Sequence, residues 1–322
     1  MARPVLLLEH PDCGLHDPGP GHPERPDRLR AIREALDADL DLSGRLERRR
    51  ARPAREPDLL RVHGAGYLAR LRAAALEAAR DGAPLWIDED TAVSGGSWDA
   101  ALAAAGCAID AVDAVLDGAA RAAFALARPP GHHACADRAM GFCLVNHAAI
   151  AVRHALSRGA ERVLVVDWDA HHGNGTQDLF YEDPSVYVLS LHLAPHYPET
   201  GRVEERGAGP GLGTTRNVPL PAGTAGDAYR ARFLEALDDA LGAFEPDLAV
   251  ASVGLDGLAG EPEGGLRLEP GDLHALVSDL VLRLPARAGR RVVGVLEGGY
   301  ALDRIGAGAV AVLRALAELP PI

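Results

Sequence analysis

The chain concentrates carboxylates and imidazoles directly after one of its apolar runs. In the stretch VLVVDWDAHHGNG, which begins at residue 163, the apolar run leads into Asp167, Asp169, His171 and His172. Side chains two positions apart on an extended chain point the same way, so Asp169 and His171 can converge, with Asp167 behind them. A metal ion needs a third ligand from a neighbouring strand, and Asp256, after the run AVASVGL, is the candidate. Two aspartates and a histidine bind Zn²⁺ with one position open, as in a catalytic site.

A second polar group, the adjacent pair His132 and His133, ends another apolar run in ARPPGHH. An imidazole near a water bound to a metal ion is a suitable general base. Each ring then needs a partner on its other nitrogen to fix its tautomer, and Asp167 and Asn174 are available. The competing interpretation is that Asp169 merely caps the following helix, because aspartate is a good N-cap. Chemistry at several strand ends favours the metal site.

A tyrosine follows two glycines in LEGGY, which ends at Tyr300. A phenol at this place could donate a hydrogen bond to an oxyanion that develops opposite the metal ion. Taken alone, a tyrosine after a strand is more often a packing residue. The assignment of Tyr300 to catalysis therefore depends on its proximity to the other polar groups.

The elements that must position these side chains alternate along the chain. Unbroken apolar runs favour strands covered on both faces, and they lie in residues 4–10, 122–133, 162–172, 185–192, 246–256 and 291–300. Segments of helical composition separate them at 26–40, 66–80, 97–117, 144–158, 227–243, 270–285 and 302–318. This alternation predicts an α/β fold with a parallel sheet, in which the site lies beyond the carboxyl ends of the strands. With no linker or repeat, we expect a single domain over residues 1–322.

Composition excludes several classes of partner. The 322 residues carry a net charge of −13, which argues against a nucleic-acid surface and is compatible with a cationic small substrate. The one basic run, at 45–55, is interpreted as a solvated helix end. Four cysteines without CxxC spacing predict reduced thiols in a cytoplasmic protein. No segment resembles a signal peptide or a membrane span, and the oligomeric state, a homo-oligomer included, is left open.

The motifs resemble those of the histone deacetylase superfamily, which includes lysine deacetylases, acetylpolyamine amidohydrolases and acetoin-utilisation proteins. The resemblance covers nearly the whole chain, from GHPERPDRL at residue 21 to LEGGY, and it includes RPPGHHA, MGFCLVNHAAIA, VVDWDAHHGNGTQ, YPETG and SVGLD. DWD and HHGNG look like the class II branch, since class I members carry Asp at the position of Asn174. The resemblance implies the arginase–deacetylase fold, with a parallel sheet of about eight strands between helices.

The resemblance also implies a role for each matching residue. The zinc ligands would be Asp169, His171 and Asp256. His132 would pair with Asp167, and His133, as the general base and acid, with Asn174. Tyr300 would polarise the acetyl carbonyl. The remaining implied residues form two sets, a substrate tunnel and a structural potassium site: Gly141, Phe142 and Tyr197 for the first, and the backbone oxygens of Asp167, Asp169 and His171 with Ser190 and Leu191 for the second.

The sequence departs from the family pattern at two places, of which the first is expected to loosen the packing beside Asp256 and the second bears on the substrate. Leu255 replaces the usual aromatic residue beside Asp256, and EPEGGL (261–266) replaces DPLGGL, so that Glu263 stands where a leucine is common. The polyamine-selective branch carries Glu there, at the pocket mouth. We therefore expect a zinc amidohydrolase that favours acetylpolyamines, with acetyl-lysine in protein as the alternative. An arginase-like manganese hydrolase and an inactive ligand-binding relative are the less favoured hypotheses.

Overall fold

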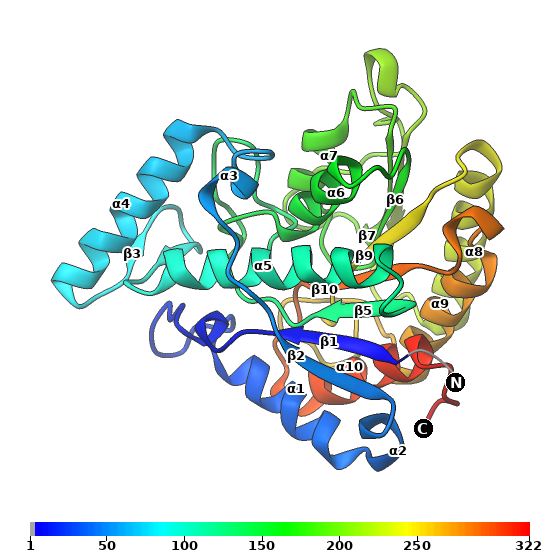
Figure 1. The fold of residues 1–322 in the computed structure, drawn as a ribbon, viewed down its shortest axis with the longest axis horizontal. Coiled ribbons are helices and arrows are strands. Elements are labelled where there is room, and N and C mark those ends of the chain that lie inside the picture. Colours follow the sequence, from blue (N-terminus) through cyan, green and yellow to red (C-terminus); the bar gives the residue numbers. More distant parts are fainter. Residues whose placement is uncertain (1–3) are drawn as a thin grey trace.

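A computed structural model describes residues 4–322 of the chain. Its centre is an eight-stranded, wholly parallel sheet with the strand order β2-β1-β5-β10-β9-β6-β7-β8 (Figure 1). The strands of this sheet are β1 (Val5–Glu9), β2 (Leu46–Arg50), β5 (Ala122–Ala125), β6 (Val163–Asp167), β7 (Val186–Leu193), β8 (Thr215–Leu220), β9 (Leu248–Val253) and β10 (Val292–Leu296). A short hairpin, β3 (Leu85–Trp86) and β4 (Ala92–Val93), lies outside it.

Helices cover both faces of the sheet, as a doubly wound fold requires. The α-helices are α1 (Asp27–Ala38), α2 (Leu40–Ser43), α3 (Glu56–Leu59), α4 (Ala65–Asp81), α5 (Ser97–Leu116), α6 (His147–Ser157), α7 (Asn174–Phe180), α8 (Gly226–Ala243), α9 (Pro270–Arg283) and α10 (Leu302–Leu316). α5 packs on α6 and lies over β1, β5 and β10, while α1, α10, α9 and α8 follow one another on the other face (Figure 1). Helix α4 projects with the β3–β4 hairpin.

The central strands are apolar because both of their faces are covered. All residues of β5, β6, β9 and β10 are buried, and β6 pairs with β9 so that Asp167 lies opposite Ser252. Since all eight strands are parallel, their carboxyl ends meet at one edge of the sheet. The predicted single α/β domain with about eight strands is confirmed.

The interpretation of residues 45–55 as a helix end is wrong. Leu46–Arg50 forms β2, an edge strand that pairs only with β1 and leaves four of its five residues exposed. An edge strand with one solvated side carries charges that discourage pairing with another chain, so it lacks the apolar run that marks a central strand. The other edge strand, β8, was not predicted for a similar reason: Thr215, Arg216, Asn217 and Pro219 interrupt its apolar pattern.

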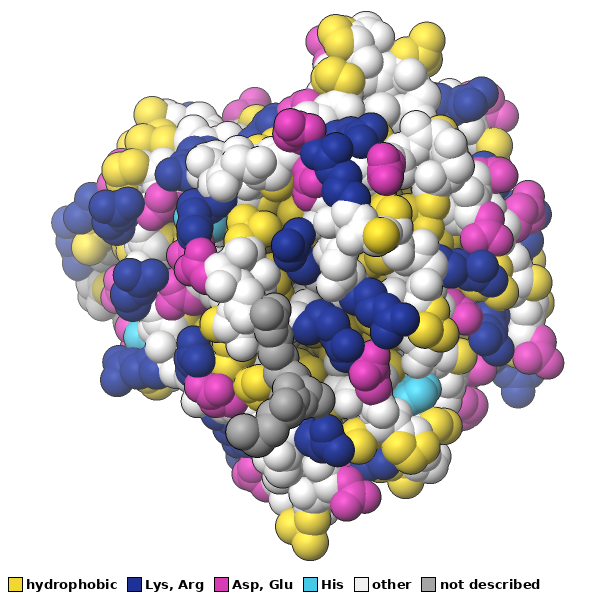
Figure 2. Space-filling model, turned by 45° about the vertical axis from the view of Figure 1, so that its right-hand side comes forward, with side chains coloured by type: hydrophobic (Ala, Val, Ile, Leu, Met, Phe, Trp, Pro, Cys, Tyr) yellow, Lys and Arg dark blue, Asp and Glu magenta, His cyan; other side chains and the backbone are white. Residues whose placement is uncertain are grey.

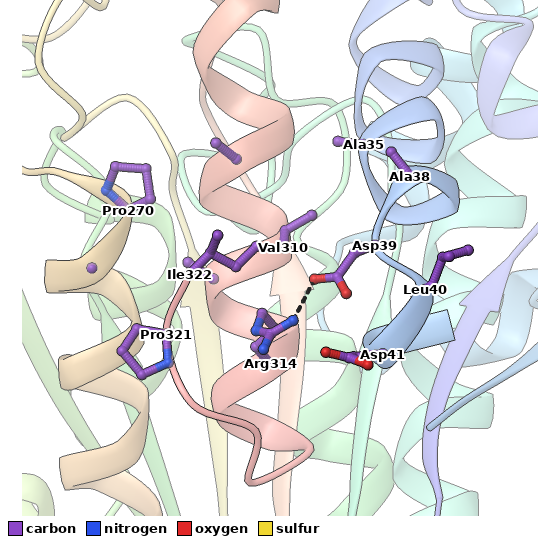
Figure 3. A pocket seen from close by; sticks show the side chains of 13 residues that line it. Ala35, Ala38, Asp39, Leu40, Asp41, Pro270, Val310, Arg314, Pro321 and Ile322 are labelled. Carbon is purple, nitrogen blue, oxygen red and sulfur yellow. Dashed lines mark hydrogen bonds and ion pairs between the residues drawn. The ribbon is translucent and has the colours of Figure 1, made fainter. Parts of the chain in front are cut away.

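The surface carries charges of both signs, and the face in Figure 2 shows arginine side chains interspersed with acidic ones. A groove of about 820 Å³ lies between α1, α2, α9 and α10, where Arg314 and Asp39 form an ion pair of 2.7 Å (Figure 3). None of the predicted catalytic residues lines this groove. Among residues 4–322, no helix is both long and apolar enough to span a bilayer.

Candidate active site

The three predicted metal ligands meet at the carboxyl edge of the sheet. Asp169 and His171 follow β6, Asp256 follows β9, and one ligand atom from each lies within 4.8 Å of the others. The Nδ1 atom of His171 is 3.0 Å from Asp169 Oδ1 and 3.2 Å from Asp256 Oδ2. Both aspartates are fully buried. Two buried carboxylates facing one imidazole need a compensating positive charge, so this donor set fits a divalent cation.

Backbone amides hold the outer oxygens of the two aspartates. Gly298 N–H donates to Asp169 Oδ2 at 2.9 Å, and Ala170 N–H donates to Asp256 Oδ1 at 2.8 Å. A Cβ atom at Gly298 would overlap the carboxylate oxygens of both aspartates, so only glycine fits there. The first glycine of LEGGY therefore lets the loop after β10 approach the three candidate metal ligands closely. Hydrogen bonds of this kind fix the orientation of the carboxylates that would bind the ion.

The two adjacent histidines have partners of different charge. His132 Nδ1 lies 2.9 Å from the Asp167 carboxylate, and His133 Nδ1 lies 2.8 Å from Asn174 Oδ1. Burial disfavours the charged form of His132, but the charges of Asp169 and Asp167 outweigh it and raise its pKa to about 10. Burial and the neighbouring His132 lower the pKa of His133 well below its usual value. A carboxylate partner favours the imidazolium, whereas a neutral amide partner leaves the free base.

Tyr300 follows β10 in the chain, four residues after the strand ends at Leu296. The Phe142 ring meets its ring edge-on at a centroid separation of 5.6 Å, and the Arg28 guanidinium carbon lies 4.8 Å from its centroid. Burial raises the pKa of Tyr300 well above its ordinary value, so the phenol keeps its proton at neutral pH. A protonated phenol near a metal ion can donate a hydrogen bond to a carbonyl oxygen.

The residues predicted to line a tunnel lie close to the histidines. The Tyr197 ring packs edge-on against His133 with centroids 5.2 Å apart. Gly141 has a φ of +54°, and a Cβ atom there would come within 2.6 Å of the His133 ring and 2.9 Å of the Tyr197 ring. The structure thus brings Gly141, Phe142 and Tyr197 together around His133 and Tyr300.

A family model described as the histone deacetylase domain matches residues 22–316. The chain belongs to the histone deacetylase family. It is 41% identical over 282 residues to a histone deacetylase-like amidohydrolase of Pseudomonas aeruginosa, covering 87% of this chain and 73% of that protein. It is 38% identical over 298 residues to a probable deacetylase of Archaeoglobus fulgidus, covering 92% and 81%.

Two further similarities are to a human relative and to a solved structure. The polyamine deacetylase HDAC10 of Homo sapiens is 37% identical over an alignment of 321 positions that covers 95% of this chain and 45% of that protein. The crystal structure of the HDA15 HD domain superposes with a TM-score of 0.91 at 34% identity, covering 99% of this chain and 90% of that one. The chain is therefore an amidohydrolase of the deacetylase type with the fold of its family.

Within this histone deacetylase fold, Glu263 lies in a loop that reaches the site through a histidine. The Glu263 carbonyl is 3.0 Å from His196 Nε2, and the His196 ring stacks on the ring of His171 at 4.8 Å. The Glu263 side chain is half-buried, and among residues 4–322 its carboxylate makes no ion pair. Leu255, the other departure, is buried and packs against Gly299 and Gly308, so it fills the space beside Asp256.

The residues predicted for potassium lie on two paired strands, β6 and β7, and in the segment that follows β6. Asp167 of β6 is opposite Ser190 of β7, and Tyr229 donates to the carbonyl of Leu191 at 3.2 Å. Asp169 and His171 follow Asp167 along the same chain segment. These oxygens therefore come from adjacent segments at the carboxyl edge of the sheet.

Sequence reasoning missed several buried groups around the site. Glu297 accepts hydrogen bonds from the amides of Gly131 at 2.7 Å and His132 at 3.1 Å, and burial raises its pKa to about 7. It therefore joins the LEGGY loop to the loop of paired histidines. The sequence does contain a sign of this role, since Glu297 ends the apolar run RVVGVLE. A carboxylate is costly to bury unless it is hydrogen-bonded or paired with a charge.

A second missed network lies behind Tyr300. Glu24 is fully buried and forms ion pairs with Arg28 at 3.2 Å and Arg128 at 2.7 Å. Arg28 in turn donates to the carbonyls of Gly299 and Glu297, each at 2.5 Å. GHPERPDRL was recognised as a family motif, but no pattern in the sequence indicated that its charged residues pair with strand ends far along the chain.

The β3–β4 hairpin, also missed, brings acidic residues close to the residues predicted to line a tunnel. Phe142 N–H donates to Thr91 Oγ1 at 3.1 Å, which fixes the hairpin beside the predicted tunnel. Burial raises the pKa of Asp90 next to its neighbour Asp88. Burial also raises the pKa of Tyr197, and the negative charges of Asp90 and Asp88 add to this effect.

Acidic residues near the predicted tunnel therefore come from two loops, Asp88 and Asp90 from this hairpin and Glu263 from residues 261–266. We call this part of the site its outer end, and the part with the candidate metal ligands and Tyr300 its inner end.

Proposed function

We propose that the chain is a zinc-dependent deacetylase that hydrolyses acetylated amines and prefers acetylpolyamines. The observation that supports it most is the meeting of Asp169, His171 and Asp256 beside two differently paired histidines and a buried tyrosine. The arrangement supplies a cation site, a free base and an oxyanion donor, which are the three requirements of amide hydrolysis by metal-activated water.

Zinc would be held by Asp169, His171 and Asp256, and when bound it would polarise the acetyl carbonyl and acidify a water molecule. His133, with its neutral Asn174 partner, accepts the proton of the attacking water at Nε2. Tyr300 donates its phenolic hydrogen to the carbonyl oxygen. His133 then returns a proton to the amine nitrogen as the C–N bond breaks, and His132, kept cationic by Asp167, stabilises the negative charge.

The preference for polyamines is supported by the acidic residues at the outer end. Asp88, Asp90 and Glu263 lie on loops around the predicted tunnel, where an acetylpolyamine places a secondary ammonium group and acetyl-lysine places peptide backbone. The similarity to a protein named polyamine deacetylase agrees with this preference. Deacetylation of lysine in protein is the second candidate, because other relatives are named histone deacetylases.

The test compares acetate release from acetylspermidine and from an acetyl-lysine peptide. A hydrogen-bonded charge pair contributes about 1.5–3 kcal/mol, or about one to two decades in kcat/KM. Glu263→Leu should therefore lower kcat/KM for acetylspermidine by about 10- to 100-fold and spare the peptide. Glu318→Leu is the matched control, since Glu318 lies near the starts of β1 and β2 at the opposite edge. Equal losses on both substrates would remove Glu263 from substrate selection.

Two further parts of the proposal concern the ion and the compartment. A structural potassium ion would be bound by backbone oxygens of Asp167, Asp169 and His171 with Ser190 and Leu191. A cytoplasmic location is supported by the four cysteines, all of which are free thiols. The arginase-like alternative requires bridging ligands for two manganese ions, and the paired histidines with Tyr300 favour the deacetylase chemistry instead.

A further inference from the structure

The backbone around Tyr300 has little conformational preference of its own. Gly298 and Gly299 precede it, and Gly299 has a φ of +117°, which side-chain-bearing residues rarely adopt. Tyr300 is also followed closely by α10, which begins at Leu302 and has no side-chain cap from its own N-cap residue Ala301. The direction of the phenol therefore depends on groups outside this segment.

Glu261 supplies such a group from another loop. Its carboxylate accepts a hydrogen bond from Tyr300 N–H at 2.7 Å and from Ala301 N–H at 3.0 and 3.1 Å. The residue is buried, with 8% of its surface exposed. It thereby satisfies two amides at the start of α10 that the helix itself leaves free. Arg28 also contacts this segment: its guanidinium donates a hydrogen bond to Gly299 O and lies over the face of the Tyr300 ring.

The loop that carries Glu261 also forms the outer end of the site. Glu263 follows two residues later, and its carbonyl is bound by His196, which stacks on the metal-ligand candidate His171. A displacement of this loop would therefore move the two amides that orient Tyr300. Buried hydrogen-bonded carboxylates transmit such displacements because leaving them unpaired is costly.

We propose that Glu261 is a positioning residue for Tyr300, and that it joins the substrate-selecting loop to the catalytic tyrosine. This inference rests on the proposed deacetylase function. Glu261 makes no contact with the reacting atoms. It acts by fixing the direction in which the phenol points, so its loss changes turnover through Tyr300 and through no other group.

The experiment measures kcat, KM and metal content for Glu261→Leu and Glu261→Gln, with acetylspermidine and an acetyl-lysine peptide. A misplacement of about 1 Å costs on the order of 10²-fold in rate, so Glu261→Leu should lower kcat by about that factor. KM should change by less than about twofold, because ground-state contacts are kept. Glu261→Gln keeps one accepting oxygen, and loss of one hydrogen bond should lower kcat by about 2- to 10-fold.

A double-mutant cycle separates positioning from a purely structural role. Each Glu261 variant is combined with Tyr300→Phe, which removes the hydroxyl. If Glu261 acts through the phenol, its substitution should cost little further turnover in the Tyr300→Phe background. Equal fold losses in both backgrounds would overturn the inference, and so would wild-type kcat in either variant. If Glu261→Leu does not fold, the cycle with Glu261→Gln decides by the same criterion.

A matched control is Glu269→Gln, an exposed glutamate on the same connection whose side chain pairs with Arg304. It should keep wild-type kcat and KM. Failure of the proposed function gives a different result: the wild-type protein itself would release no acetate from either substrate. A wild-type enzyme that is active while both Glu261 variants are unimpaired contradicts only the inference on Glu261.

Discussion

Asp169, Asp256 and Tyr300 lie two to four residues after the ends of the buried strands β6, β9 and β10, whereas Glu263 and Asp90 belong to loops that connect the elements. At the inner end, backbone amides hold both aspartates and a glutamate holds the tyrosine backbone. At the outer end, the Glu263 carboxylate makes no ion pair among the residues that the structure describes. The inner residues are thus held by hydrogen bonds from several elements, while, within residues 4–322, the Glu263 carboxylate is not held in this way.

This difference separates chemistry from substrate choice. A substitution at the inner end disturbs several hydrogen bonds at once, so it should affect every substrate equally. A substitution of Glu263 or Asp90, in contrast, would remove one contact with the distal part of the substrate and should change selectivity alone. The following experiments would fail to show this division if both ends acted on the same step.

The largest effect is expected for the metal ligands. Asp256→Ala should abolish both metal binding and acetate release, because an open site with three ligands cannot lose one. Metal analysis of the purified variant beside wild type measures this directly. Asp303→Ala, an exposed aspartate at the start of α10, is the control that should keep full metal content. Full zinc occupancy in Asp256→Ala would refute the ligand assignment.

The next effect concerns proton transfer. His133→Ala should lower kcat by about 10²–10⁴-fold while substrate binding changes little, because only the general base is lost. Steady-state kinetics with His132→Ala beside it tests the difference between the two partners, Asn174 and Asp167. If His132→Ala proves far more damaging, the two histidines have the opposite roles.

A smaller loss is expected for the oxyanion donor. Tyr300→Phe should keep the fold and the metal ion but lower turnover by about 10²–10³-fold, the effect of removing one such donor. The loss should be the same for acetylspermidine and an acetyl-lysine peptide, in contrast to Glu263→Leu. Near-normal turnover of Tyr300→Phe would leave this tyrosine with only a packing role.

The same division decides what could be predicted from the sequence. Asp169, His171 and Asp256 each follow a long apolar run, and parallel strands place such residues at one edge without further information. The pairing of His132 with Asp167 does not follow from this rule: the residues leave the same two partners open for either ring, and only the family resemblance implies which ring each partner would take. The strands β2 and β8 could not be found by this rule either, because both are edge strands in which charged or polar residues, and in β8 also a proline, replace the unbroken apolar run.

The contacts between distant loops were also beyond the sequence. Glu261 binds the amides of Tyr300 and Ala301, and Arg28 reaches Gly299 across 271 positions of the chain. A glutamate in a glycine-rich loop has the same local signature whether it is solvated or buried. Only burial distinguishes Glu261 from a solvated glutamate, and the sequence pattern of a loop does not reveal which of its side chains are buried.

The smallest expected effect is a loss of stability in acid, caused by His63, a buried histidine bonded to the loop after His133 and to the N-cap residue of α6. His63 lies 2.9 Å from the Cys135 carbonyl through Nδ1 and accepts from Asn146 N–H through Nε2, so the neutral ring is required. Burial lowers its pKa from 6.5 to about 4.

The folded state therefore binds this proton less readily than the unfolded state, and stability is lost as the pH falls below 6.5 and levels off below 4. Between pH 7.5 and 5.5 this one group should lower the free energy of unfolding by about 1.3 kcal/mol, or about tenfold in the folded-to-unfolded ratio. Urea unfolding of wild type and His63→Gln at both pH values measures it. The variant can keep both hydrogen bonds through its amide, and its stability should fall less on acidification by that amount. An identical fall in both proteins would show that His63 is not held neutral by the polar groups beneath the site.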